Sequence, residues 1–409
     1  MAGSTPVLVY SWWFGLIMAR YHQHGKTCRG FVVQHRALFF LIICQVLGFA
    51  LPTHAAPSAG VKVVFLSPDT SRFWHMVGGF MQAVADDLEI DLTIYTDQDR
   101  NRFSYRDLLN KVLEQPDRPD YIVFMCKEKV THDMLTRVGE AGIKVFTFNT
   151  SVPEEELAKT GQPREKLPHW IGHLSPDNRA AGATLATELF KRYQQKTGNQ
   201  ANMLVGLSGS RDSSAAIHRN EGLRNMLEGQ GSIDHQLLFA DWDQEEARLK
   251  VERLIARYPA LDLIWNASDG MALGAIDAAR ATGRKPGEDL MVGGLDWEQR
   301  ALDEIGEGRM ALSLGRHFMG GGLALLLIHD YHTGYDFAGQ GGVSMNYSLA
   351  IADRDNLGGV REVMDPANWD ETDFRQFSKH YTEALRGDTA TASELLDDFM
   401  GALSPGFQR

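Results

Sequence analysis

The sequence predicts an α/β protein with two doubly wound parallel-sheet lobes joined by a multi-strand hinge. From residue 61 onward, short apolar runs alternate with amphipathic stretches of helical length, and this alternation occurs in two successive series. Strands that alternate with helices give parallel sheets with helices on both faces. The runs are continuously apolar, which is typical of strands that are covered on both faces.

Each series predicts four strands with helices between them. In the first series the strands are expected at 61–66, 92–95, 121–125 and 145–148, and the helices at 72–87, 104–115 and 130–141. In the second series the strands are expected at 203–207, 236–240, 261–265 and 291–295, and the helices at 213–228, 243–258, 268–283 and 297–307.

The order of these elements predicts where the lobes begin and end. We expect an N-terminal lobe at 56–173, to which 316–340 returns, and a C-terminal lobe at 174–315, to which 341–363 returns. The glycines of 315–322 suit a hinge, because glycine accommodates large backbone rotations. Residues 364–409 are expected to form a helical C-terminal extension, with helices at 371–385 and 391–403.

The first 55 residues have the pattern of a secretory signal peptide. Lys26, Arg29 and Arg36 precede an uncharged apolar run at 37–51, and small residues follow up to Ala55. A basic leader, a short apolar core and a small-residue exit are the three parts of such a peptide. We expect cleavage after Ala55 and a periplasmic protein; a retained membrane anchor is the alternative interpretation.

Composition excludes some partners. The chain is globular in composition, with 44% hydrophobic residues, and carries a formal net charge of -12. An acidic protein repels phosphate backbones, so we expect no nucleic-acid partner. Beyond residue 55 the sequence contains one cysteine, Cys126, which follows an apolar run and is expected to be buried. The chain after the leader therefore has no cysteine pair for an internal disulfide.

Polar and aromatic residues recur directly after the predicted strands. In open parallel sheets, ligands bind beyond the carboxyl ends of the strands. Ser67, Asn149, Trp242, Asp269 and Asp296 all stand at such positions. Carboxylates, amides and hydroxyls suit the hydroxyl groups of a sugar, and aromatic rings suit its apolar faces. The strand ends therefore predict a site for a small sugar-like ligand.

Four motifs carry a resemblance to a known family. They are VVFLSPDTSRFWHMVGGFMQA after the first strand, SGSRDSSAAIHRNEGLRNML, NASDGMALGAIDAA and VGGLDWEQRALDEIGEG. From about residue 61 to about 353 the chain resembles the periplasmic sugar-binding proteins of the ribose-binding type. These are type I periplasmic binding proteins, related to the ligand core of lactose-repressor-like regulators. The resemblance implies their two-lobed fold.

The resemblance also implies roles for residues in these motifs. Phe73 and Trp74 would sandwich the sugar, Arg219 of the Arg-x-x-Gly pattern would reach its hydroxyls, and Asp269 and Asp296 would lie in the cleft. The full predicted ligand-binding set is Ser67, Phe73, Trp74, Asn149, Arg219, Trp242, Asp269 and Asp296.

Structural roles remain open as alternatives for some of these residues. Asp269 and Asp296 stand where a carboxylate could instead cap the following helix. Arg219 could be a solvated helix residue, and Phe73 could belong to the core. Asn149 stands where ribose binders carry an acid, and Ser268 replaces an amide common in the family. These two departures argue against ribose as the ligand.

The functional hypothesis is a periplasmic substrate-binding protein that captures a small sugar or sugar-like ligand by hinge closure and delivers it to the membrane permease of an ABC-type importer. We expect a monomer that is not an enzyme and holds no cofactor or metal. Phosphate-loop, His-Glu-x-x-His and Gly-x-Ser-x-Gly patterns are absent from the sequence.

Two other functions are alternatives to this one. A periplasmic receptor similar to autoinducer-2 receptors would present its ligand to a membrane histidine kinase or another signalling partner. LTIYTDQDRNRFSYRDLLNKVLEQPDRPDYIVF and WIGHLSPDNRAAGATLATELF look similar to such receptors, and this alternative stays open. A lactose-repressor-like transcription factor needs a basic helix-turn-helix at its N-terminus, where this chain has its apolar leader.

Overall fold

The computed structural model describes residues 60–229, 234–339 and 341–407. The expected signal peptide and its cleavage site lie outside the described residues. Among the described helices, none combines the length and the apolar character needed to cross a membrane.

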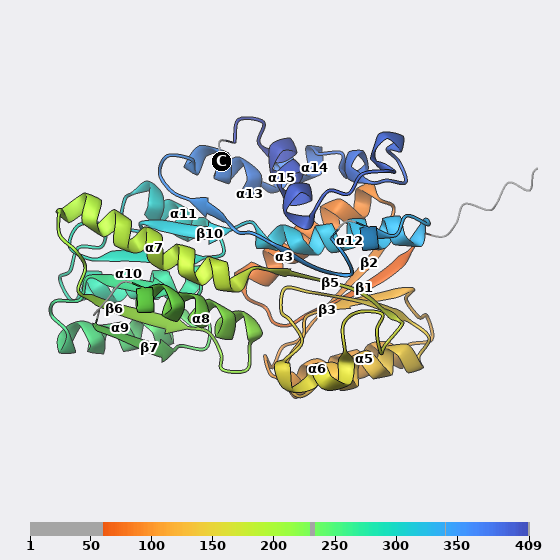
Figure 1. Cartoon of the computed structure of the whole chain (residues 1–409), viewed down its shortest axis with the longest axis horizontal. Helices are drawn as coiled ribbons and strands as arrows, with labels where there is room; N and C mark the ends of the chain where they lie inside the picture. Colours follow the sequence, from red (N-terminus) through yellow and green to blue (C-terminus); the bar gives the residue numbers. More distant parts are fainter. Residues whose placement is uncertain (1–59, 230–233, 340, 408–409) are drawn as a thin grey trace, which may run out of the picture. The chain divides into compact units, whose positions relative to one another are not determined.

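The first lobe is built on a six-stranded parallel sheet in the order β11-β5-β4-β3-β1-β2. Figure 1 labels four strands of this sheet, β1, β2, β3 and β5. Its central strand β3 is buried along its whole length, and β4 is buried after its first residue, Lys144, as their apolar sequences predict. The strands are β1 (Lys62–Ser67), β2 (Asp91–Thr96), β3 (Tyr121–Phe124), β4 (Lys144–Phe148), β5 (Trp170–Pro176) and β11 (Ser344–Tyr347). The helices are α3 (Arg72–Asp87), α4 (Arg102–Leu113), α5 (Thr131–Glu140), α6 (Glu154–Thr160) and α12 (Gly320–His332).

The second lobe repeats this plan with the order β12-β10-β9-β8-β6-β7. Only the edge strand β12 (Ala350–Ala352) runs antiparallel to its described neighbour. The other strands are β6 (Met203–Ser208), β7 (Asp234–Phe239), β8 (Leu263–Asn266), β9 (Met291–Leu295) and β10 (Leu312–Gly315). The helices are α7 (Asn178–Thr197), α8 (Ser214–Gly229), α9 (Gln244–Arg257), α10 (Asp269–Ala281) and α11 (Gln299–Gly306). The predicted fold class, two α/β lobes on parallel sheets, is confirmed.

The chain crosses between the two sheets after β5, after β10 and after β11. Two of these crossings occur later in the sequence than the predicted lobe boundaries. Strand β5 continues to Pro176, and β11 adds to the edge of the first sheet beside β5 instead of returning to the second lobe. The alternating burial of β11 explains why its short sequence did not indicate a strand: one face of this edge strand is exposed.

Arg316 links two of these crossings to the C-terminal segment. Its backbone is left-handed, with φ 75°, and its side chain is buried. The guanidinium donates hydrogen bonds to the carbonyl oxygen and the hydroxyl of Ser348, on the crossing between β11 and β12. It also pairs with Asp397 of α15 (Ala392–Leu403). Arg316 therefore fixes the hinge segments to the last described helix.

The C-terminal segment differs from its prediction in one region. The expected helix at 371–385 is replaced by the end of α14 (Pro366–Glu371) and two short 3-10 turns, Phe374–Phe377 and Glu383–Leu385. Tertiary hydrogen bonds explain the difference, because Asp330 of α12 accepts from the hydroxyl of Ser378 and the backbone N–H of Lys379. The segment packs on α3 and α12, while α13 (Leu357–Met364) packs on α11 of the other lobe.

Candidate functional site

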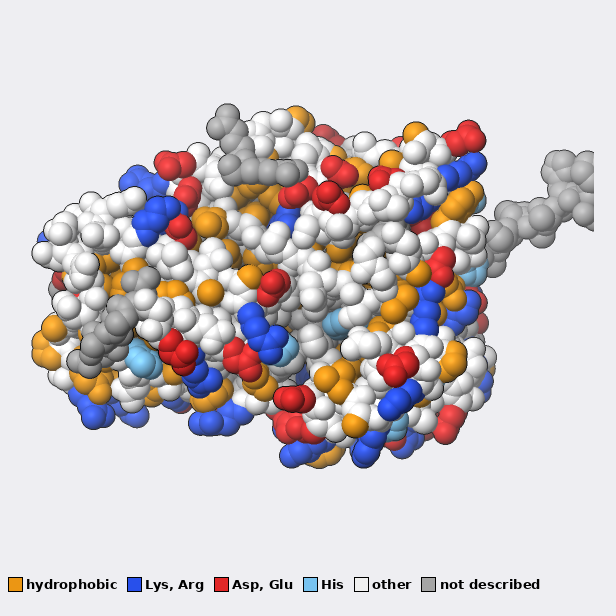
Figure 2. All heavy atoms as spheres, viewed as in Figure 1, with side chains coloured by type: hydrophobic (Ala, Val, Ile, Leu, Met, Phe, Trp, Pro, Cys, Tyr) orange, Lys and Arg blue, Asp and Glu red, His pale blue; other side chains and the backbone are white. Residues whose placement is uncertain are grey.

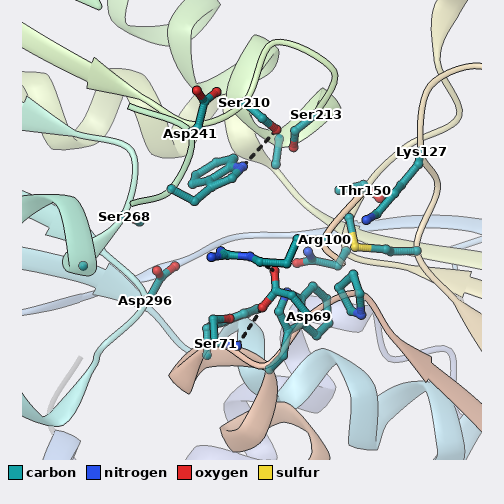
Figure 3. Close-up of a pocket in the computed structure, with 18 of the residues that line it drawn as sticks. Asp69, Ser71, Arg100, Lys127, Thr150, Ser210, Ser213, Asp241, Ser268 and Asp296 are labelled. Atoms are coloured by element: carbon teal, nitrogen blue, oxygen red, sulfur yellow. Dashed lines mark hydrogen bonds and ion pairs between the residues drawn. The ribbon is translucent and has the colours of Figure 1, made fainter. Parts of the chain in front are cut away.

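A cavity of about 540 Å³ lies between the two lobes at the carboxyl ends of their strands. This size is within the range of small-molecule sites, and the position is the one expected for ligands of open parallel sheets. Figure 3 shows Asp69 and Ser71 on one side of it and Ser210, Ser213 and Asp241 on the other. Both lobes therefore supply polar side chains to one enclosed space.

The structure brings six of the eight predicted site residues together on the cavity wall. Three come from the first lobe and three from the second. They are Phe73, Trp74, Asn149, Arg219, Trp242 and Asp296.

Ser67 and Asp269 lie behind the wall, in contrast to the expectation that they face the ligand. The Ser67 hydroxyl donates to the backbone oxygen of Asp69. The fully buried carboxylate of Asp269 accepts from the hydroxyl of Ser313, at 2.8 Å, and from the backbone N–H of Glu298, at 3.0 Å. The hydrogen bonds of both residues therefore hold the loops that line the cavity in place.

Arg219 is held rigidly in the second turn of α8. Its side chain is 3% exposed. Nε donates to Oδ1 of Asn178 at 2.8 Å, and Nη1 donates to the carbonyl oxygen of Ala267 at 2.6 Å. The guanidinium lies 5.8 Å from the ring centre of Trp242. Burial rules out the solvated-helix alternative, and the fixed guanidinium presents further N–H donors to the cavity.

The packing of α7 against α8 determines where Arg219 stands. A Cβ on Gly222, one turn after Arg219, would lie 2.0 Å from the backbone oxygen of Arg179 on α7. A Cβ on Gly182 of α7 would lie 2.0 Å from the backbone oxygen of Arg219 itself. The two helices therefore meet backbone to backbone, which only glycine permits.

Trp242 occupies a strained turn after β7. Its φ is 62°, and that of Asp241 is 49°. The indole Nε1 donates to the hydroxyl of Ser210 at 3.1 Å (Figure 3). The ring lies over Gly209, where a Cβ would stand 2.0 Å from Cε2 and Cζ2 of the indole. Gly209 thus makes room for the ring on the cavity wall.

Replacing Gly209 with alanine is expected to displace the Trp242 ring. Because the added methyl would overlap the indole, the ring must rotate away and lose its hydrogen bond to Ser210. We expect weaker ligand binding and a changed tryptophan fluorescence spectrum. Gly401→Ala is the control, since a Cβ there meets no described atom within 4 Å. Unchanged affinity in the Gly209 variant would show that the ring does not contribute to binding.

Aromatic side chains form the wall of the first lobe. Phe73 stacks on the imidazole of His317, with ring centres 4.7 Å apart, and meets Trp74 edge to face at 5.2 Å. Trp74 is mostly buried and packs on Phe65 and Phe148. The arrangement joins Phe73, at the start of α3, to a residue on the hinge crossing after β10.

Acidic side chains form the opposite wall. Oδ1 of Asp296 lies 3.1 Å from Nε2 of His317. Burial lowers the pKa of His317, although Asp296 acts in the opposite direction. Burial and the nearby charges of Asp296 and Glu298 raise the pKa of Asp269 well above its ordinary value. Burial and Asp296 also raise the pKa of Glu298 to about 7, and Arg72 opposes this shift.

The raised pKa of Glu298 predicts a pH-dependent stability. The folded protein keeps a proton on Glu298 between pH 4.5, the ordinary pKa, and about 7, while the unfolded chain loses it. The free energy of unfolding should therefore fall as pH rises through this window. Thermal unfolding from pH 4 to 8 should show a smaller fall for Glu298→Gln than for the wild type. The exposed Glu288→Gln is the control, and equal slopes in all three proteins would contradict the prediction.

Polar contacts cross between the lobes at the edge of the cavity. Arg102 of α4 pairs with Asp212, before α8, at 3.1 Å. Arg72 of α3 lies 3.5 Å from Glu298, before α11. The backbone N–H of Ser151 donates to the hydroxyl of Ser214 at 3.0 Å. These contacts hold the lobes against each other around the cavity.

Sequence reasoning missed several lining residues. Arg100, Asp212 and Glu298 were not predicted as site residues, yet all three line the cavity. They stand three or four residues beyond the ends of strands β2, β6 and β9. Searching for charged residues across the whole connection from strand to helix would have found them.

The chain matches the family model described as periplasmic binding protein domain over residues 61–334. A periplasmic sugar-binding protein from Pseudomonas fluorescens has a solved structure with a TM-score of 0.71 and 29% identity, covering 82% of this chain and 99% of that one. The D-ribose/D-allose-binding protein of Pseudomonas aeruginosa is 26% identical over 165 residues, which cover 40% of this chain and 47% of the relative.

A regulator is also among the relatives. The ribose operon repressor of Halalkalibacterium halodurans is 28% identical over 155 residues, 37% of this chain and 45% of the relative. The chain thus spans about half the length of the curated relatives it matches. Since the family model covers more than half of the chain, the protein belongs to the periplasmic binding protein domain family.

Proposed function

We propose that this protein captures a small sugar or sugar-like ligand in the periplasm by closure of its two lobes and delivers it to an ABC-type importer. The observation that carries the proposal is the interlobe cavity, in which a fixed guanidinium, an amide and a carboxylate face one space. These groups belong to Arg219, Asn149 and Asp296. The names of two relatives, which describe sugar-binding proteins, support the same ligand class.

The chemistry of the wall suits a polyhydroxylated ligand. Arg219 can donate to two neighbouring hydroxyl oxygens, and Asp296 can accept from hydroxyl groups. Oδ1 of Asn149 is buried and has no partner among the described residues, so a ligand donor would satisfy it. The indole of Trp242 offers a flat apolar surface for a sugar ring.

The cross-lobe contacts support closure as the mechanism. The ion pairs of Arg102 with Asp212 and Arg72 with Glu298 join side chains from different lobes. Opening the hinge would separate these pairs and expose the cavity to solvent, while closure would exclude water from the ligand. Exclusion of water strengthens hydrogen bonds between the ligand and charged side chains.

Binding without chemistry is the simplest use of this site. The matched sugar-binding relatives are described as binding proteins, and the cavity residues suffice to hold hydroxyl groups. On the face shown in Figure 2, acidic and basic side chains are interspersed, so this face has no broad basic surface for a nucleic acid.

Isothermal titration against monosaccharides, disaccharides and polyols tests the proposal. We expect at least one compound to bind with a Kd on the order of 1 μM, equivalent to about 8 kcal/mol. Failure of every compound to bind would overturn it. Uptake of the identified compound by cells with and without the gene then separates an importer from a receptor, because loss of a receptor leaves uptake intact.

A further inference from the structure

Two cationic side chains, the buried Arg219 and the half-buried Lys127, face the cavity without a carboxylate partner among the described residues. Arg219 donates to the neutral oxygens of Asn178 and Ala267. Lys127, which follows β3, has no hydrogen bond or ion pair from its ammonium group to the described part of the chain; Nζ lies 4.6 Å from the ring centre of Tyr105. Figure 3 shows the Lys127 side chain pointing into the cavity beside Thr150.

The carboxylates of the wall are mostly engaged by other groups. All but one of them have a basic side chain within 4 Å or a backbone N–H as donor. The pairs are Asp69 with Arg100 and the Ser71 N–H, Asp212 with Arg102, Asp296 with His317, Glu298 with Arg72, and Asp243 with the Glu246 N–H. The remaining one, Asp241, is exposed. None of these carboxylates is therefore in direct contact with the ammonium group of Lys127.

The surroundings of Lys127 make an unpaired ammonium unfavourable. Burial lowers the pKa of Lys127, and the charges of Asp97, Asp69 and Asp212 oppose this shift without contacting the ammonium. An ammonium group that is partly removed from water and has no hydrogen-bond acceptor carries a desolvation penalty. A negatively charged oxygen on the ligand would supply both the acceptor and the opposite charge.

We propose that the ligand is a sugar acid whose carboxylate accepts a hydrogen bond from Nζ of Lys127, while Arg219 and Asp296 hold its hydroxyl groups. This inference rests on the proposed function and specifies its ligand. Lys127 follows β3 of the first lobe, and Asp296 and Arg219 belong to the second. The acid group and the hydroxyl groups would therefore be held by different lobes, so both ends of the ligand contribute to closure.

Matched pairs of compounds test the inference. The pairs are D-glucuronate with D-glucose, D-galacturonate with D-galactose, and D-gluconate with D-glucitol, each titrated at pH 7 by calorimetry. We expect at least one acid to bind about tenfold or more tightly than its neutral partner. Binding of neutral sugars with no advantage for any acid overturns the inference and leaves the proposed function standing. Absence of binding by all six compounds counts against both.

Substitutions at Lys127 test whether the preference for acids over neutral sugars comes from this side chain. Lys127→Gln should bring the acid-to-neutral affinity ratio close to one, with neutral sugars bound within about threefold of the wild-type affinity. Lys127→Arg keeps the charge and should keep most of the preference. Lys129→Gln is the matched control, because Lys129 lies in the same loop but is 65% exposed and pairs with Glu128.

Thermal unfolding of each variant separates a folding defect from a lost contact. The aliphatic stem of Lys127 also covers Tyr105, so Lys127→Gln could lower the melting temperature. In that case the acid-to-neutral affinity ratio of the Lys127→Arg variant shows whether a positive charge at this position gives the preference for acids. An acid preference that survives in Lys127→Gln, or that disappears equally in Lys129→Gln, overturns the assignment.

Discussion

Replacement of Arg219 by alanine is expected to weaken sugar binding by about 100-fold or more. Hydrogen bonds to a charged group contribute about 1.5–3 kcal/mol each, and a guanidinium can give two to a ligand. The loss of two such bonds corresponds to about 3 kcal/mol at least, which is more than two factors of ten in Kd. Titration calorimetry with the identified sugar measures the effect.

The control for this experiment is Arg224→Ala on the same helix. Arg224 is exposed and does not line the cavity, so its removal should leave the affinity unchanged. Removal of Arg219 also leaves Asn178 and the Ala267 carbonyl without their donor, which should lower the stability by about 1–3 kcal/mol. Affinity of the Arg219 variant within threefold of the wild type would show that the guanidinium has only a structural role.

The fold could be predicted because its signals are local. Helix α3 begins and ends at the predicted residues, 72 and 87. Its apolar periodicity and the signals that end it lie within the helix and in the residues next to it. The failed helix at 371–385 shows the limit of such signals. Its path is set by Asp330, which contacts Ser378 and Lys379 from more than forty positions away along the chain.

The site could be predicted only in part, for a related reason. Asp269 and Asp296 follow strands β8 and β9 and have the same residue type. The sequence alone therefore does not show which of the two contacts the ligand. Asp296 lines the cavity, whereas the Asp269 carboxylate is occupied by Ser313 from β10. Which carboxylate faces the cavity depends on partners that come from other parts of the chain. Asp269 has a structural role, but not the predicted one of capping the following helix: Ser268 caps α10 by accepting from the backbone N–H of Met271.

The same reasoning explains why Lys127 was not predicted as a site residue. A lysine after a strand is ordinarily a solvated residue. Its importance lies in the absence of a carboxylate partner in the described surroundings of its ammonium group, which no local pattern encodes. Charges at an enclosed site have to be considered together with every element that packs around them.

Gly222→Ala is expected to lower both stability and affinity, because it separates α8 from α7. The added Cβ would lie 2.0 Å from the backbone oxygen of Arg179, and no side-chain rotation can relieve a contact with backbone. Overpacking of this kind typically destabilises by about 1–3 kcal/mol. Helix α8 must shift, and Arg219, one turn earlier, shifts with it and loses its alignment with Asn178 and Ala267.

Gly229→Ala, at the end of the same helix, provides the matched control. A Cβ there meets no described atom within 4 Å, so this substitution should be neutral or raise the melting temperature slightly, as alanine favours helices. Thermal unfolding and sugar titration on both variants should therefore diverge, with several degrees lost and weaker binding only at Gly222. Equal behaviour of the two variants would mean that α7 and α8 can separate without moving Arg219, and that the close helix contact does not position the guanidinium.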